Sequence, residues 1–170
     1  SYQRFRHIHG TATSKIRSAS QGYVELKGLG EWMPGDQMHT PFSRKRCLWY
    51  HCTIEKKERI GKRSSWTNIL TKTSDQIFHL VDETGYCVID PEDAYVVPES
   101  SQTWYGYSSQ DISPPQSKKS SLFSGRIGFG NYRFTEQLIS PASHVYVIGV
   151  FKTIQKNITH DAIASRVEDL

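Results

Sequence analysis

The sequence predicts a mainly β domain, and it favours a small antiparallel barrel of the OB type over a two-sheet sandwich. Short runs rich in β-branched and aromatic residues recur along the chain, and glycine or proline separates most of them. In residues 77–89, two such runs flank Asp82-Glu83-Thr84-Gly85, a sequence typical of a hairpin turn that places glycine at positive φ. Both arms of this hairpin are apolar on both faces, so we expect other strands to cover it.

Length and composition are those of one globular domain. A chain of 170 residues, 36% of them hydrophobic, can bury a core without covalent cross-links. No apolar run approaches the ~20 residues of a membrane-spanning helix. The chain begins without methionine and ends in polar residues, so we expect a domain cut from a longer protein. Three cysteines, Cys47, Cys52 and Cys87, are too few for a disulfide framework, and we expect each to be a small buried hydrophobe.

The first half of the chain contains five predicted segments. Period-two alternation of polar and apolar residues marks the strands, and glycine or clustered polar residues mark the loops. The segments are one or two helical turns at 11–20, a half-buried strand at 23–28 ended by Gly28 and Gly30, the longest strand at 46–57, a polar loop at 58–65, and a short strand or loop at 66–70.

The second half adds a long insertion and a second hairpin. The run from Val145 to Phe151 is almost unbroken in apolar residues and predicts an interior strand, in which Gly149 indicates a bulge, a sharp bend or close approach of another backbone. After the central hairpin we predict a strand at 94–98, a serine-rich surface loop at 99–130, strands at 132–139 and 144–154 joined by residues 140–143, and a short helix or the start of a linker at 159–170. Residues 1–158 are thus one β domain.

Several short motifs follow one another along the chain. They are Thr11-Ala-Thr-Ser-Lys-Ile16, Gly22-Tyr-Val-Glu-Leu-Lys-Gly28, Pro41-Phe-Ser-Arg-Lys-Arg-Cys47 before Trp49-Tyr50, Phe78-His-Leu-Val-Asp-Glu-Thr-Gly85, Val88-Ile-Asp-Pro91, Tyr132-Arg-Phe-Thr-Glu136 and Val145-Tyr-Val-Ile-Gly149. In this order they resemble the GIDE domain, also called the Beside-A-Membrane domain, over nearly the whole chain. The structural residues of the resemblance are Gly22, Pro41, Cys47, Asp82, Gly85, Glu136 and Gly149.

The resemblance implies a domain that sits beside a membrane, next to or between transmembrane helices. Eukaryotic members carry a C-terminal RING finger and act as ubiquitin ligases of the mitochondrial outer membrane or of plastids, and this domain is proposed to contact their substrates. Bacterial relatives keep the domain without the RING. The present chain lacks the paired Cys and His ligands of a RING zinc site, so we expect no catalytic residue and no cofactor in it. We expect a non-catalytic module that contacts a protein partner, a substrate or the membrane surface.

A basic patch is the main candidate binding site. Eight of the 21 Lys and Arg residues lie between positions 43 and 66, against two glutamates. Beside a membrane, such a patch binds anionic lipid headgroups. On an OB-type barrel it predicts instead a site for single-stranded nucleic acid, with Trp49, Tyr50 and Trp66 as stacking platforms, and the third possibility is a solvated face without a ligand. The predicted site consists of Arg44, Lys45, Arg46, Lys56, Lys57, Arg59, Lys62, Arg63 and Trp66.

Two further groups of polar residues have structural explanations. Cys47, His51 and Cys52 resemble a metal cluster in sequence, but in a strand Cys47 and Cys52 point to opposite faces, so we expect no metal site. Glu136 lies between two apolar strands, and we expect it to be half-buried and paired with Arg133 or Arg126. A ligand-facing role for Glu136 is the alternative.

Overall fold

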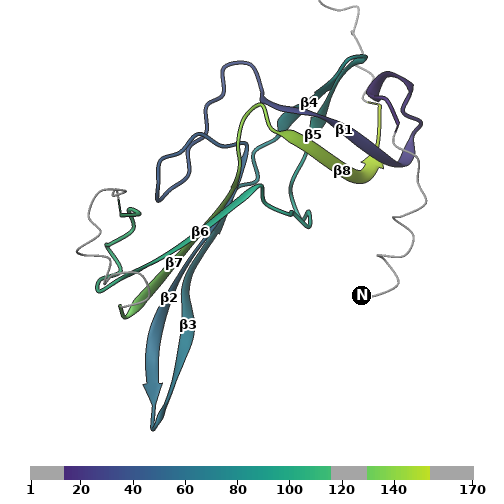
Figure 1. Ribbon diagram of the computed structural model, residues 1–170. Coiled ribbons are helices and arrows are strands. Elements are labelled where there is room, and N and C mark those ends of the chain that lie inside the picture. The colour runs from purple at the N-terminus through teal and green to yellow at the C-terminus, as the bar shows by residue number, and fades with distance from the viewer. Residues whose placement is uncertain (1–13, 116–129, 154–170) are drawn as a thin grey trace, which may run out of the picture.

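The computed structural model describes residues 14–115 and 130–153, and most of these residues form antiparallel β-structure. Four strands form a sheet of order β5-β4-β1-β8, and four others form a sheet of order β3-β2-β7-β6 (Figure 1). The elements are a 3-10 helix η2 (Ile16–Ser18) and the strands β1 (Gly22–Trp32), β2 (Trp49–Ile60), β3 (Arg63–Thr73), β4 (Phe78–Asp82), β5 (Gly85–Ile89), β6 (Ser100–Gly106), β7 (Tyr132–Ile139) and β8 (His144–Phe151).

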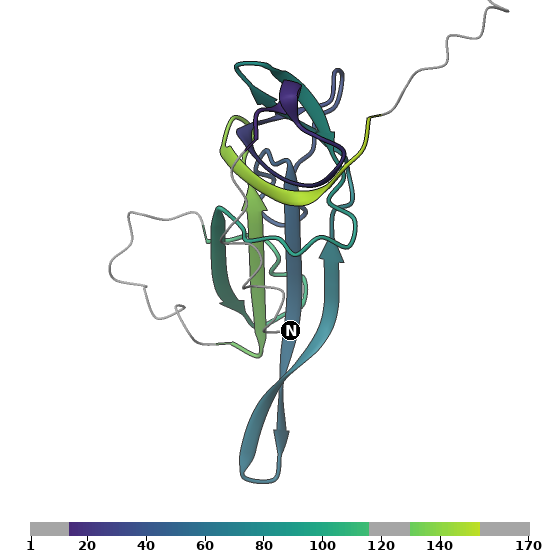
Figure 2. The ribbon, with the colours of Figure 1, turned by 90° about the vertical axis from the view of Figure 1, so that its right-hand side faces the viewer.

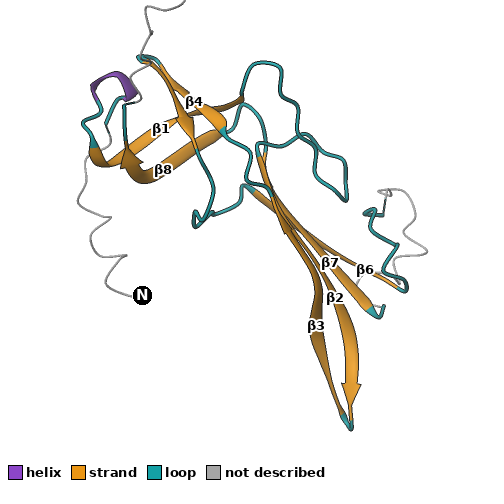
Figure 3. Cartoon of the chain, turned by 180° about the vertical axis from the view of Figure 1, so that it is seen from behind, coloured by secondary structure: helices purple, strands orange, loops and turns teal. Residues whose placement is uncertain are grey.

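The prediction of a mainly β domain is confirmed, but the prediction of a closed barrel is wrong. Within the described ranges both sheets are open, each with two edge strands. They lie end to end rather than face to face, so the sandwich is not formed either (Figures 1 and 3). Each sheet has a hydrophobic cluster of its own, one around Leu26 and Leu80 and the other around Phe134 and Cys52. Of the one or two helical turns predicted at 11–20, the three residues Ile16–Ser18 form the 3-10 helix η2.

The central hairpin forms as predicted, with β4 paired to β5. Its predicted place inside the sheet is wrong, because β5 is an edge strand. Apolar residues on both faces therefore do not mean burial on both faces: Leu80 is fully buried, whereas Tyr86 is 66% exposed and Val88 48% exposed. Gly85 does not adopt the positive φ that the turn sequence predicts for it, and its N–H instead donates to Asp82.

Asp82 joins the hairpin turn to η2. Its Oδ1 accepts hydrogen bonds from the N–H groups of Thr84 (2.7 Å) and Gly85 (3.1 Å) and from the Thr84 hydroxyl, and its Oδ2 accepts one from the N–H of Ile16 (2.8 Å). Burial opposes ionisation of this carboxyl, but the hydrogen bonds outweigh it and lower the pKa of Asp82 to about 2. One carboxylate thus positions a segment 66 residues away.

The second predicted hairpin is wrong, because β7 and β8 belong to different sheets. Residues 140–143 carry the chain from one sheet to the other and are bound there by Gly30, whose N–H donates to the Ser143 carbonyl (2.9 Å) and whose carbonyl accepts from the Ala142 N–H (2.8 Å). On the same crossing, the N–H of Leu48 donates to the carbonyl of Ile139 (2.7 Å). The apolar β8 is consequently an edge strand rather than an interior one.

Several segments predicted as loops are strands in the structure, and one predicted strand is a loop. β1 continues through Gly28 and Gly30 to Trp32, and β2 and β3 form one long hairpin through the segment predicted as a loop at 58–65. Part of the predicted insertion is strand β6, whereas residues 94–98 form no strand. The rest of the insertion at 116–129 and the predicted segment at 159–170 lie outside the described residues.

The close backbone approach predicted at Gly149 occurs at Gly28 instead. A Cβ at Gly28 would overlap the carbonyl group of Val81 on β4, at 2.9 Å from its carbon, whereas nothing lies within 4 Å of a Cβ at Gly149. The register of β8 against β1 is also unbroken at Gly149, so no bulge is present there. The glycine in the middle of β1 is required because β4 is packed against it.

We predict that Gly28→Ala lowers the free energy of unfolding by about 1–3 kcal/mol, because the new methyl group meets backbone that cannot rotate away. The matched control is Gly149→Ala on the neighbouring strand, which we expect to change stability by no more than about 0.5–1 kcal/mol, toward greater stability. Urea denaturation followed by tryptophan fluorescence measures both. Equal effects of the two substitutions would contradict this account.

A second prediction concerns pH. The pKa of Asp82 is about 2 in the folded protein and about 4 in an unfolded chain, so its stabilising effect is complete above pH ~4 and is lost as pH falls toward 2. Asp82→Asn should therefore lower stability by about 1–2 kcal/mol at neutral pH. Denaturation curves from pH 7 to pH 2 should show the wild type and the variant converging at the acid end. A gap that stays constant with pH would exclude this role of the carboxylate.

Candidate functional site

The core of the β3-β2-β7-β6 sheet contains one buried carboxylate. Glu136 is 2% exposed and lies among apolar side chains. Its Oε2 accepts hydrogen bonds from the N–H groups of Phe42 (3.2 Å) and Ser43 (3.1 Å), and its Oε1 accepts one from the Ser43 hydroxyl. The predicted pairing of Glu136 with Arg133 is wrong, since Arg133 binds Glu55 on the other face of the sheet through its Nε (2.6 Å) and Nη2 (2.7 Å). Arg126, the other predicted partner, lies outside the described residues.

The loop held by Glu136 displays the first part of the basic patch. The Thr40 N–H donates to the Lys45 carbonyl (2.8 Å), and the Lys45 N–H donates to the Thr40 hydroxyl (3.2 Å), which closes the loop. Within it, Arg44 has a φ of 59° and an exposed side chain. The guanidinium of Arg46 lies 4.5 Å from the ring centroid of Trp32. Residues 44–46 are thus held on a fixed loop, and Arg46 already has a partner.

Cys47 and Cys52 lie in the same core as Glu136. The prediction that they face opposite sides is wrong because β2 begins only at Trp49, so Cys47 is not on the strand. Burial and the negative charge of Glu136 raise the pKa of both thiols to about 12. His51 is elsewhere, with Nδ1 2.7 Å from the Thr73 hydroxyl oxygen. Among the described residues, no group of three or more His, Cys, Asp or Glu side chains is arranged to hold a metal ion.

Replacing the buried carboxylate should loosen this loop. We predict that Glu136→Ala lowers the free energy of unfolding by about 2–4 kcal/mol, because two backbone N–H groups and a hydroxyl lose their acceptor. Thiol alkylation followed by mass spectrometry should show faster labelling of Cys47 and Cys52 in the variant than in the wild type. Gln137→Ala, on the other face of the same strand, is the control, with an expected change of about 0.5 kcal/mol and no change in labelling. Unchanged labelling in Glu136→Ala would refute the assigned role.

The basic patch predicted as one site is divided by the length of β2. Residues 44–46 precede the first residue of this strand, and Lys62 and Arg63 follow its last residue. At about 3.3 Å per residue, the twelve residues of β2 separate the two groups by about 36 Å. Figure 1 shows the β2–β3 hairpin projecting from the rest of the protein, with its turn at the far end. Lys56, Lys57 and Arg59 lie in the half of β2 nearer this turn, and we call the group of Lys56, Lys57, Arg59, Lys62 and Arg63 the distal cluster.

The residues of the distal cluster lie on two faces of the hairpin. Lys57 and Arg59 share a face with Glu55, and their register partners on β3 are Trp66 and Ser64. Lys56 points to the opposite face, as does Arg63, which is paired with Ile60 at the end of the hairpin. The last register pair between β2 and β7 is Lys56 with Tyr132, so beyond that point the hairpin has only two strands (Figure 2).

Trp66 anchors one face of the cluster. The guanidinium carbon of Arg133 lies 4.8 Å from a ring centroid of Trp66, and Nζ of Lys57 lies 5.8 Å away. The ring of Tyr105 is 5.8 Å from that of Trp66. Trp49 and Tyr50 are only 6% and 8% exposed, so neither is available as the stacking platform that the nucleic-acid hypothesis requires.

A polar hollow of about 370 Å³ lies where the hairpin leaves the sheet. Its position is fixed by the Lys57 N–H, which donates to the Asn131 carbonyl (2.7 Å). The sequence did not indicate Ser64 or Asn131, because residues 58–65 read as a loop and because nothing in the sequence shows that residue 131 lies beside Lys57. The hollow is lined by Lys57, Arg59, Lys62, Ser64 and Asn131.

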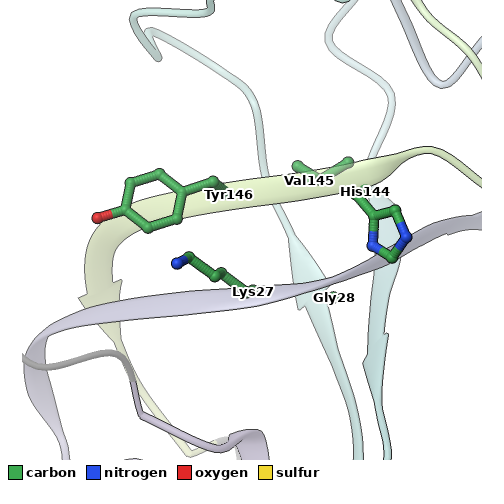
Figure 4. A pocket seen from close by; sticks show the side chains of 5 residues that line it. All are labelled: Lys27, Gly28, His144, Val145 and Tyr146. Carbon is green, nitrogen blue, oxygen red and sulfur yellow. The ribbon is translucent and has the colours of Figure 1, made fainter.

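A second hollow, of about 220 Å³, lies on the other sheet. Figure 4 shows Lys27 and Tyr146 side by side on β1 and β8, with His144 farther along. Nζ of Lys27 is 5.3 Å from the ring centroid of Tyr146, and a hydrogen bond with Glu25 raises the pKa of Tyr146. This hollow is mainly apolar and holds one fixed cation, so it is a less complete site than the first.

That second hollow opens on a sheet face with many exposed apolar side chains. By register, alternate residues of all four strands project to this face. Six large hydrophobic residues on it are at least 36% exposed, and they are Tyr23, Leu29, Tyr86, Val88, Tyr146 and Val150. The same face also carries Glu25, Lys27, Glu31, His79 and His144, so polar residues lie among its apolar side chains.

Comparison with known proteins gives one family. The family model GIDE, described as E3 ubiquitin ligase, matches residues 50–162, which is more than half of the chain. The chain belongs to the GIDE family. No curated protein and no solved structure matches it. The described part of this GIDE chain contains no helix long and apolar enough to cross a membrane.

Most of the residues assigned to the GIDE resemblance have structural roles. Gly22 begins β1 with a φ of 107°, which favours glycine. Pro41 begins the turn that Glu136 holds, and Cys47 is fully buried beside it. Asp82 and Gly85 close the central hairpin, as described above. Gly149 is the exception, since neither its φ nor its surroundings require glycine.

Proposed function

We propose that this GIDE chain is a non-catalytic binding module of a membrane-anchored protein, and that its distal cluster contacts the anionic surface of the membrane. The observation that supports this most directly is the concentration of five cations at the end of a projecting hairpin, with Glu58 as the only carboxylate in the segment from 56 to 63. Each Lys or Arg near an anionic membrane surface contributes about 1 kcal/mol of attraction. Ligase chemistry then belongs to other parts of such proteins.

A projecting hairpin suits contact with a flat surface. Its end extends beyond β7, so the cluster can approach lipid headgroups before the bulk of either sheet does (Figures 1 and 2). The side chains of Lys56, Lys57 and Arg59 are exposed, and neither of the two ion pairs between described residues involves them. Their charge is therefore available for an external anion.

The nucleic-acid hypothesis has less support. Of the three aromatic residues proposed to stack on bases, two are in the core, and Trp66 already has Arg133 and Lys57 against its ring. A protein partner with an acidic surface remains the alternative, because its carboxylates would meet the same cations. The experiment below tests the lipid assignment.

We predict that the wild-type protein co-sediments with phosphatidylcholine vesicles that contain phosphatidylserine and not with phosphatidylcholine alone. Changing Lys57, Arg59 and Lys62 together to Glu should weaken this binding by at least about 3 kcal/mol, or about a hundredfold. Binding of the wild type should also weaken with added salt, because the Debye length shortens from about 10 Å at 0.1 M to about 3 Å at 1 M.

The control variant changes Arg44, Lys45 and Lys72 to Glu, which alters net charge equally at the other end of β2. We expect it to retain most of its binding, because those side chains lie about 30 Å or more from the hairpin turn. Equal loss in both variants would show that only net charge matters, and absence of binding by the wild type would refute the proposed function.

A further inference from the structure

We propose that the polar hollow at the base of the hairpin is a binding site for a phosphomonoester group, carried by a membrane lipid. This inference rests on the proposed function and goes further, because it replaces a general attraction to anionic lipid by a defined site for one kind of headgroup. The hollow has a volume of about 370 Å³ and is mainly polar.

Three cations line the hollow. Lys57 and Arg59 project from one face of β2, and Lys62 lies in the turn that joins β2 to β3. Lys57 is fixed at both ends, since its N–H donates to Asn131 and its ammonium lies over the ring of Trp66. The three cations therefore line one hollow.

No carboxylate in the described ranges neutralises these three side chains. Glu55 shares their face but is bound by Arg133 through two hydrogen bonds. Glu58 projects to the opposite face of β2, where its carboxylate accepts a hydrogen bond from the Thr67 hydroxyl (3.2 Å). The hollow consequently concentrates positive charge, which favours an anion of high charge.

The donor set fits a phosphomonoester better than a phosphodiester. A phosphomonoester carries a charge of about −1.5 to −2 at neutral pH and offers three strong acceptor oxygens, whereas a diester carries one negative charge. Arg59 supplies a planar fork of N–H donors, and Lys57 and Lys62 supply ammonium groups. Ser64 and Asn131 line the same hollow, and their side chains are of types that carry uncharged hydrogen-bond donors.

A lipid is favoured over a phosphorylated protein by the surroundings of the hollow. Lys56 and Arg63 project from the opposite face of the same hairpin end, so cations are present on both faces of the hairpin. A surface that is anionic over a wide area can attract the cations of both faces at once, whereas one phosphorylated side chain would occupy the hollow alone. The hairpin also extends beyond the sheets toward whatever surface it meets (Figure 1).

The test compares two kinds of phosphatidylcholine vesicle with matched total headgroup charge, one containing phosphatidylinositol 4-phosphate and the other phosphatidylserine. We expect the wild type to bind the phosphomonoester vesicles at least about tenfold more tightly. The double variant Arg59→Gln, Lys62→Gln should lose this preference. The matched double variant Lys56→Gln, Arg63→Gln loses the same charge from the opposite face and should keep the preference while binding both vesicles more weakly. Unchanged thermal unfolding midpoints confirm that both variants are folded.

Each outcome bears on a different part of the inference. Equal binding of the wild type to the two vesicles overturns the phosphomonoester site but leaves the proposed function intact, whereas binding to neither overturns both. Equal loss of preference in the two double variants also overturns the site. A phosphoserine peptide that binds as tightly as the phosphomonoester vesicles, with the same dependence on Arg59 and Lys62, would overturn the assignment to lipid.

Discussion

The crossing between the two sheets is the constraint on which the rest of the structure depends. Two of the four connections between the sheets pass through it, one leading from β1 to β2 and the other from β7 to β8. Gly30 binds the second connection through its own N–H and carbonyl, and the N–H of Leu48 binds Ile139. A Cβ at Gly30 would overlap Cδ1 of the buried Leu48, so a larger residue at this position would force that side chain to move.

Glu136 extends this constraint into the second sheet. The loop from Pro41 to Ser43 leads into β2, and its N–H groups at Phe42 and Ser43 are bound to a carboxylate on β7. Burying an ionised carboxylate is unfavourable unless hydrogen bonds satisfy it, and here the bonds also fix where β2 starts. Beyond that point β2 pairs with β7 over eight residues. The free end of β2, which forms the hairpin and carries the distal cluster, therefore has a defined direction.

Local features of the sequence predicted local structure well. The hairpin around Asp82 and Gly85 and the burial of Cys47 and Cys52 follow from nearby residues alone. The predictions that proved wrong depended on contacts between residues far apart in the sequence. The partner of Glu136 is 94 residues away at Phe42, and no pattern near either residue reveals it. Likewise β7 and β8 read as a hairpin because their connection is short, although each pairs with a strand from a different sheet. The two parts of the basic patch are separated by β2, which has the twelve residues predicted for it but begins three residues later, at Trp49.

Stability does not explain the distal cluster. The end of the hairpin has two strands, and its residues Lys56, Lys57, Glu58 and Arg59 are all exposed. An isolated two-stranded ribbon is only marginally stable in water. Two like charges at positions 57 and 59 are about 7 Å apart along the strand and repel by about 0.6 kcal/mol even in bulk water. Trp66 offsets part of this through Lys57 and Arg133, but Arg59 and Lys62 have no such contact among the described residues. Cations placed where they weaken the fold are better explained by an external anion that they bind than by the folding of the hairpin itself.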